Sequence, residues 1–212
     1  MPGGYDHAVY GADVTLAPLN LCAETLDGVR NHSWRRPAPS TPEGEVVAWA
    51  DRIAYVCHDF EDAVRAGVLT PADLPEAVAD VVGRSRSRQI GAFVHAVYDA
   101  IDRTHAVGMT EPAASALAAF RAFNFERIYL RPAACRQADK VIGLLRGLVD
   151  FFVDAPSRLS AEVTGVHPGL QAGSLEAAAV AVRYVSGMTD RYALALGVEL
   201  LGWRPEDLPR GV

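Results

Sequence analysis

The chain has 212 residues, of which 50% are hydrophobic, and this is enough to bury a core as one domain. Its formal net charge of −6 excludes the general basic field that attracts nucleic acid or an anionic membrane, so neither is expected as a partner. The three cysteines (Cys22, Cys57 and Cys135) lie far apart with no CxxC pair, which argues against a disulfide framework or a structural zinc site and favours a reducing, cytoplasmic location.

Residues 1–40 are predicted to form a loop with a short helix, and residues 41–67 a long helix. Thr41 can cap this helix with Pro42 in its first turn, and Gly67 follows the last residue of the periodic pattern. Apolar residues at helical spacing predict that most of the helix is buried. They are Val46, Val47, Ala50, Ile53, Ala54, Cys57, Phe60 and Val64.

The same helix carries Asp51, Tyr55 and Asp59 at positions i, i+4 and i+8, so the three share one face over roughly 12 Å of helix axis. Carboxylates among apolar side chains are costly unless something compensates their charge. Two explanations stay open. The acids pair with arginines such as Arg52 or Arg65, or they belong to a functional site.

Residues 68–154 are predicted to form pocket and packing helices, and residues 155–212 the C-terminal helices. One of the pocket and packing helices runs to Tyr129, and Pro132 marks its end. Ser174 caps the last helical stretch. No segment shows the alternation of a strand, so the predicted fold is all-α, a single helical domain.

A second line of side chains lies on the helix that ends at Tyr129. Arg121, Phe125 and Tyr129 again follow the spacing i, i+4 and i+8 and share one face. Aromatic residues at this spacing belong to a core more often than to a pocket wall, and the residues alone leave both explanations open.

Four segments, in order, resemble the HD-superfamily phosphohydrolases of the bacterial deoxyguanosine-triphosphate triphosphohydrolase type. They are LNLCAETLDGVRNHSW, DRIAYVCHDFEDAVRAG, FRAFNFERIYLRP and YVSGMTDRYALALG. The opening GGYDHAVYG resembles the segment that follows the catalytic core in this family. The resemblance therefore implies the C-terminal part of the catalytic domain, without the N-terminal helices that carry the first metal ligands, and with the catalytic His upstream of Met1.

The resemblance implies metal-dependent hydrolysis of a deoxynucleoside triphosphate to the deoxynucleoside and tripolyphosphate, in a protein that forms homo-oligomers. It implies a divalent ion such as Mg²⁺ or Mn²⁺, with Asp51 as the metal ligand that this chain carries. The substrate-binding residues that it implies are Arg52 and Arg121 for the phosphates, Asp59 for the sugar 3′-hydroxyl, Tyr55 for the sugar, and Tyr129 for the sugar or base.

The dipeptide His58-Asp59 is an alternative metal position, because an HD pair names the superfamily. In the family this pair precedes a Gly-His loop, whereas here Phe60 and Glu61 continue the helix. The resemblance therefore favours Asp51.

One carboxylate makes an incomplete metal site, so the chain by itself is expected to be inactive. The alternative function is a catalytically inactive oligomerisation or regulatory module that binds nucleotides. A third, an unrelated helical ligand-binding domain, requires the four ordered matches to be accidental.

Overall fold

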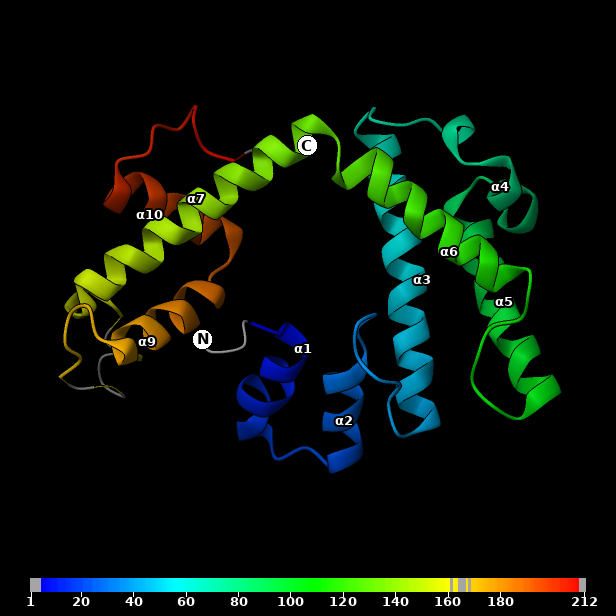
Figure 1. Cartoon of the computed structure of the whole chain (residues 1–212), viewed down its shortest axis with the longest axis horizontal. Coiled ribbons are helices and arrows are strands. Elements are labelled where there is room, and N and C mark those ends of the chain that lie inside the picture. The colour runs from blue at the N-terminus through cyan, green and yellow to red at the C-terminus, as the bar shows by residue number, and fades with distance from the viewer. Residues whose placement is uncertain (1–4, 161, 164–166, 168, 210–212) are drawn as a thin grey trace. The chain divides into compact units, whose positions relative to one another are not determined.

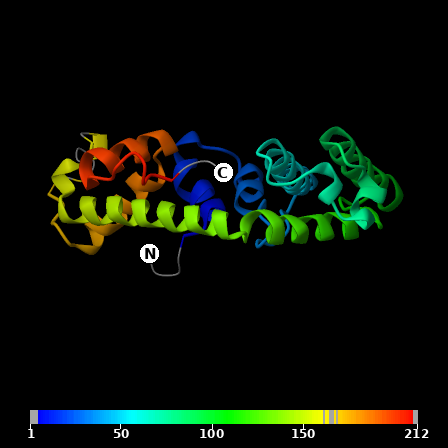
Figure 2. The ribbon, with the colours of Figure 1, turned by 90° about the horizontal axis from the view of Figure 1, so that it is seen from above.

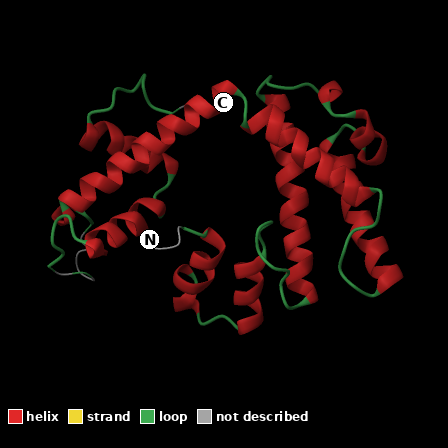
Figure 3. Ribbon diagram, viewed as in Figure 1, coloured by secondary structure: helices red, strands yellow, loops and turns green. Residues whose placement is uncertain are grey.

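The computed structural model describes residues 5–160, 162–163, 167 and 169–209. These residues form helices joined by loops and turns, and the described part contains no strand (Figure 3). The prediction of an all-α fold is therefore confirmed. Contacts divide the chain into two compact units, Met1–Leu130 and Arg131–Val212, a finer division than the single domain that the sequence predicts.

The N-terminal unit contains the helices drawn from blue to green in Figure 1. They are α1 (His7–Tyr10), η1 (Gly11–Thr15), η2 (Ala17–Leu19), α2 (Ala23–Asn31), α3 (Pro42–Arg65), η3 (Pro71–Asp73), α4 (Glu76–Val82), α5 (Arg86–Thr104), α6 (Ala113–Asn124) and η4 (Phe125–Tyr129). The C-terminal unit contains α7 (Pro132–Asp154), η5 (Pro156–Arg158), α9 (Leu175–Ser186) and α10 (Asp190–Leu201).

The ends of α3 follow the capping signals in the sequence. The Thr41 side chain accepts a hydrogen bond from the Gly44 N–H at 3.2 Å, and Pro42 is the first helical residue. The helix ends at Arg65, two residues before Gly67, which has a positive φ of 69°. The predicted long helix is thus confirmed with nearly the same boundaries.

The core of the N-terminal unit lies where α3, α4, α5 and α6 pack together. Phe60 of α3 meets Phe120 of α6 edge to face, with ring centres 5.3 Å apart. The predicted buried stripe of α3 is correct for Ile53, Cys57 and Phe60. It is wrong for Val46 and Val47, which are 42% and 59% exposed, and for Ala50, which is also exposed, while Ala54 and Val64 are half-buried. Periodicity shows which residues share a face, but not whether another element covers that face.

The C-terminal unit is built on α7, with α9 and α10 packed along it (Figures 1 and 2). Leu148 and Phe152 of α7 are almost completely buried. Gly197 lets α10 approach α7 closely, because a Cβ atom at this position would lie only 2.3 Å from a methyl carbon of Leu144. The unit therefore has its own core, formed by the fit of apolar side chains.

The junction at Pro132 differs from the prediction. Pro132 begins α7 instead of only ending the preceding helix, because a missing N–H costs nothing in a first turn. The predicted helix up to Tyr129 consists of α6 and the π-helical turn η4, in which the Leu130 N–H bonds the Phe125 carbonyl at 3.0 Å. Within the described ranges, none of these helices combines the length and apolar character that a membrane span requires.

Candidate functional site

Two of the three residues that share a face of α3, Tyr55 and Asp59, contact Tyr129 at the end of the α6–η4 segment. The Tyr129 hydroxyl donates a hydrogen bond to the Asp59 carboxylate, and the rings of Tyr55 and Tyr129 lie 6.0 Å apart. Asp59 and Tyr129 are half-buried, while Tyr55 is 41% exposed. The structure thus brings together three of the predicted substrate-binding residues, Tyr55, Asp59 and Tyr129.

The surroundings of Tyr129 keep its hydroxyl protonated. Burial raises the pKa of Tyr129 above the usual value for a phenol, and the hydrogen bonds with Asp59 and Tyr55 raise it further. At neutral pH the hydroxyl is therefore a stable donor. It orients the Asp59 carboxylate, which keeps acceptor positions for a second donor.

The three residues predicted to share a face of the second helix, Arg121, Phe125 and Tyr129, contact one another in sequence order. The Arg121 guanidinium lies 5.4 Å from the centre of the Phe125 ring, and that ring lies 5.4 Å from the Tyr129 ring. Phe125 is 40% exposed and Tyr129 is half-buried. These exposures do not fit a core position, and a pocket wall stays the prediction for this face.

Arg52 and Arg121 meet at Trp34, in the loop between α2 and α3. The Cζ atoms of Arg52 and Arg121 lie 5.1 Å and 4.7 Å from the centre of the Trp34 ring. Among the described residues, neither arginine forms an ion pair with an acidic side chain. The Nε atoms of both arginines and the indole nitrogen of Trp34 are buried without a hydrogen-bond partner in this part of the chain.

This cluster concentrates positive charge. The two guanidinium carbons are within about 10 Å of each other, since each lies about 5 Å from the same ring. Two unit charges at that distance repel by roughly 2 kcal/mol at an effective dielectric constant of about 20. Each cation–π contact returns roughly 0.5–2 kcal/mol. The two contacts together offset a repulsion of this size, and an anion bound at the terminal nitrogens would add a direct attraction.

Asn124 links α6 to α3 through a buried hydrogen bond. Its side-chain amide donates to the Val56 carbonyl at 2.8 Å, and the residue is only 1% exposed. This bond lies between the two lines of predicted site residues and holds their helices together. The sequence analysis missed Asn124, although a polar residue next to the buried stripe of Leu117 and Phe120 was a usable signal.

Asp51 stands apart from these contacts. It is exposed, and the described residues contain no group of three His, Cys, Asp or Glu side chains that could hold a metal ion. His58 is also exposed on this helix and belongs to no such group among the described residues. Pairing with an arginine, the structural alternative for the acids, applies to Asp62, which lies 3.6 Å from Arg65. Asp51 and His58 therefore have no further metal ligands gathered around them in the part of the chain that the structure describes.

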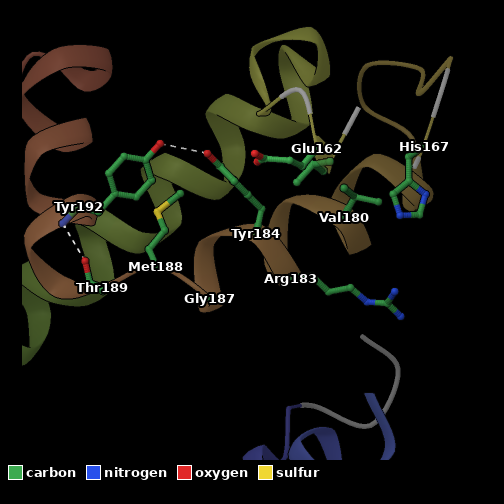
Figure 4. Close-up of a pocket in the computed structure, with 10 residues that line it drawn as sticks. Glu162, His167, Val180, Arg183, Tyr184, Gly187, Met188, Thr189 and Tyr192 are labelled. Carbon is green, nitrogen blue, oxygen red and sulfur yellow. Dashed lines mark hydrogen bonds between the residues drawn. The ribbon is translucent and has the colours of Figure 1, made fainter. Parts of the chain in front are cut away.

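The C-terminal unit contains a pocket of about 710 Å³ between α9 and α10 (Figure 4). At one end the hydroxyls of Tyr184 and Tyr192 are hydrogen-bonded at 3.1 Å, and burial together with this bond raises the pKa of Tyr184 to about 12. Arg183 points away from this pair in Figure 4. None of the predicted site residues lines this pocket.

A second pocket, of about 630 Å³, lies between α2 and α3. Gly28 and Gly44 line it, and a Cβ atom at Gly28 would lie 3.6 Å from the Gly44 Cα atom. Glu24 and Glu43 also line it. These acidic side chains make the pocket an unsuitable place for a phosphate.

Comparisons with known proteins show which proteins the chain is similar to. The model of a family described as a phosphohydrolase-associated domain matches residues 107–198. The chain is 36% identical over 177 residues to a deoxyguanosinetriphosphate triphosphohydrolase-like protein of Caldanaerobacter subterraneus, covering 83% of this chain and 50% of that protein. Proteins with the same description from Clostridium perfringens and Clostridium tetani are each 31% identical, and the matches cover 91% and 92% of this chain. The chain spans 59% of the length of each of these two.

Proposed function

Because the chain belongs to the deoxyguanosinetriphosphate triphosphohydrolase-like family of the HD superfamily, we propose that it forms the nucleotide-binding part of an enzyme that hydrolyses deoxynucleoside triphosphates to deoxynucleoside and tripolyphosphate. The chain spans about half to three-fifths of the length of the relatives it matches. The complete active site is therefore proposed to include residues that the relatives carry in the remainder of their length.

The observation that supports this proposal best is the pair of arginines that form no ion pair with an acidic side chain among the described residues. Arg52 and Arg121 come from different helices and converge on one indole ring. Guanidinium groups bind phosphate oxygens through paired, charge-assisted hydrogen bonds. We assign Arg52 and Arg121 to the phosphate groups, where their role is to neutralise charge and hold the chain of phosphates in position.

The neighbouring Tyr55, Asp59 and Tyr129 are assigned to the sugar. Asp59 accepts a hydrogen bond from the 3′-hydroxyl, while Tyr129 keeps the carboxylate oriented. Tyr55 packs against the sugar where a ribose 2′-hydroxyl would have to fit, and an unpaired buried hydroxyl is costly. This arrangement favours a deoxynucleotide over a ribonucleotide.

Asp51 is proposed as one contribution of this chain to a divalent metal site. Its exposed carboxylate is a suitable oxygen ligand, but a single carboxylate leaves such an ion mostly hydrated. We therefore expect no triphosphohydrolase turnover from the 212-residue chain alone. Anion-exchange chromatography of each dNTP incubated with the chain and Mn²⁺ checks this, and release of tripolyphosphate would contradict it.

Binding tests the proposal directly. We expect the chain to bind dGTP in EDTA, measured by calorimetry, and Asp59→Ala to weaken binding by about tenfold through the loss of a charged hydrogen bond. Asp59→Ala should also reduce the preference for dGTP over GTP. Asp62→Ala is the matched control, since this exposed acid on the same helix has only a surface ion pair, and it should leave both quantities unchanged. Equal effects of the two changes would contradict the assignment.

The inactive regulatory module remains the alternative function, and turnover in the gene's full product separates the two. An in-frame His-Asp motif upstream of Met1 in the genomic DNA would favour the enzyme. Nucleotide binding without turnover by the full product, together with a nucleotide-dependent oligomer in light scattering, would favour the module.

A further inference from the structure

Trp34 contacts both proposed phosphate-binding arginines, and the sequence analysis assigned it no role. It lies in the loop between α2 and α3, and one side of it packs against the apolar core of the N-terminal unit. The guanidiniums of Arg52 and Arg121 lie 5.1 Å and 4.7 Å from its ring centre. We propose that Trp34 is a positioning residue, which holds the two arginines together as one binding element for a chain of phosphates. This inference rests on the proposed function.

The loop that carries Trp34 is itself held in place. The Asp27 carboxylate accepts hydrogen bonds from the backbone N–H and the hydroxyl of Ser40, at 2.6 Å and 2.8 Å. Pro39 packs so closely on Gly44 that a Cβ atom at Gly44 would lie 2.7 Å from it. These contacts hold the end of the loop, and the packing of Trp34 against the core holds the indole ring, which thus offers a surface on which two flexible side chains can be ordered.

The state of the arginines fits this role. Free arginine side chains lose considerable rotamer freedom when they bind a ligand. Here each Nε is already covered, whereas the terminal nitrogens are not among the buried unpaired atoms of the described residues. Trp34 thus leaves the terminal nitrogens for the ligand and reduces the entropy lost on binding.

Ordering two arginines together has a specific consequence. A tripolyphosphate offers more oxygen atoms and more charge to two guanidiniums within about 10 Å of each other than a single phosphate does. When the arginines move independently, this advantage decreases. Loss of Trp34 should therefore reduce the preference for tripolyphosphate over orthophosphate, an effect that general destabilisation of the fold does not produce.

The experiment measures binding of inorganic tripolyphosphate and orthophosphate to the 212-residue chain in EDTA. Trp34→Leu keeps apolar contact with the core but removes the aromatic face, and Trp34→Phe keeps a face. We expect Trp34→Leu to weaken tripolyphosphate binding by about tenfold and lower the preference for it, and Trp34→Phe to restore most of both. Trp49→Leu is the matched control, because Trp49 contacts Arg52 but not Arg121 among the described residues, and it should leave the preference for tripolyphosphate unchanged.

Fluorescence gives a second measurement. A variant with Trp49→Phe and Trp203→Phe contains Trp34 as its only tryptophan, and tripolyphosphate should change its emission because the stacked cations gain a ligand. Suppose that Arg52→Ala and Arg121→Ala reduce binding. The inference about Trp34 is then overturned if the emission does not change on binding, or if the Trp34→Leu protein keeps the wild-type preference for tripolyphosphate. If neither arginine variant reduces binding, or the wild-type chain binds no tripolyphosphate, the proposed function itself is overturned.

Discussion

The long helices of the two units, α3 with 24 residues and α7 with 23, position their neighbours in different ways. Helix α3 packs on α6 through the apolar core and also makes directional polar contacts with α6 and η4, namely Asn124 on the Val56 carbonyl and Tyr129 on Asp59. Helix α7 is joined to α10 through close apolar fit, with Leu144 against Gly197 and Leu201 against Gly147. Polar contacts set a direction for each side chain, which a binding site needs, whereas close fit sets only distance and volume.

The largest expected effects test whether each unit depends on its own core. Phe120 in the N-terminal unit and Phe152 in the C-terminal unit are both almost completely buried. Changing either residue to alanine should lower the free energy of unfolding of its own unit by about 3–5 kcal/mol. In urea, Trp34 and Trp49 report on the N-terminal unit and Trp203 on the C-terminal unit. If either variant shifted the urea transition of both tryptophan signals by the same amount, the two units would not depend on separate cores.

A smaller effect tests the close fit of α10 on α7. Gly197→Ala places a methyl group where a carbon of Leu144 lies 2.3 Å away, so the side chain must shift, at a cost of about 1–3 kcal/mol. Gly91→Ala on α5 is the matched control, because nothing lies within 4 Å of the added methyl group. It should stabilise the protein by about 0.5–1 kcal/mol through helix propensity. Thermal unfolding measures both changes, and effects of the same sign would contradict the packing argument.

The smallest expected effect is the acid dependence of the loop that carries Trp34. The hydrogen bond from the Ser40 N–H, helped by the Ser40 hydroxyl, lowers the pKa of Asp27 below its usual value. Since the pKa is lower in the folded state, this stabilisation is present above about pH 4 and is lost as the pH falls through the folded-state pKa.

Asp27→Asn should therefore destabilise the protein at pH 7 but have less effect near pH 3, measured by urea unfolding at the two values. Ser40→Ala keeps the backbone donor and should show a weaker version of the same pattern. An effect of Asp27→Asn that is larger in acid would show that the sign of this argument is wrong.

The sequence by itself determined the features that depend on local chemistry. Thr41, Pro42 and Gly67 mark the ends of α3, and the spacing of Asp51, Tyr55 and Asp59 places them on one face. The four ordered segments led to the family that the comparisons support. These results follow because capping and periodicity involve residues that are close in the chain.

Only the tertiary structure decided which of these faces meet. It joined Tyr129 to Asp59, placed Arg52 and Arg121 on Trp34, and left Val46 and Val47 exposed. The reason is physical: a helical pattern states which side chains share a surface, whereas the partner of that surface depends on how distant segments pack. A single tryptophan in a loop carries no periodic signal, so the contact that links the two arginines could be found only in three dimensions.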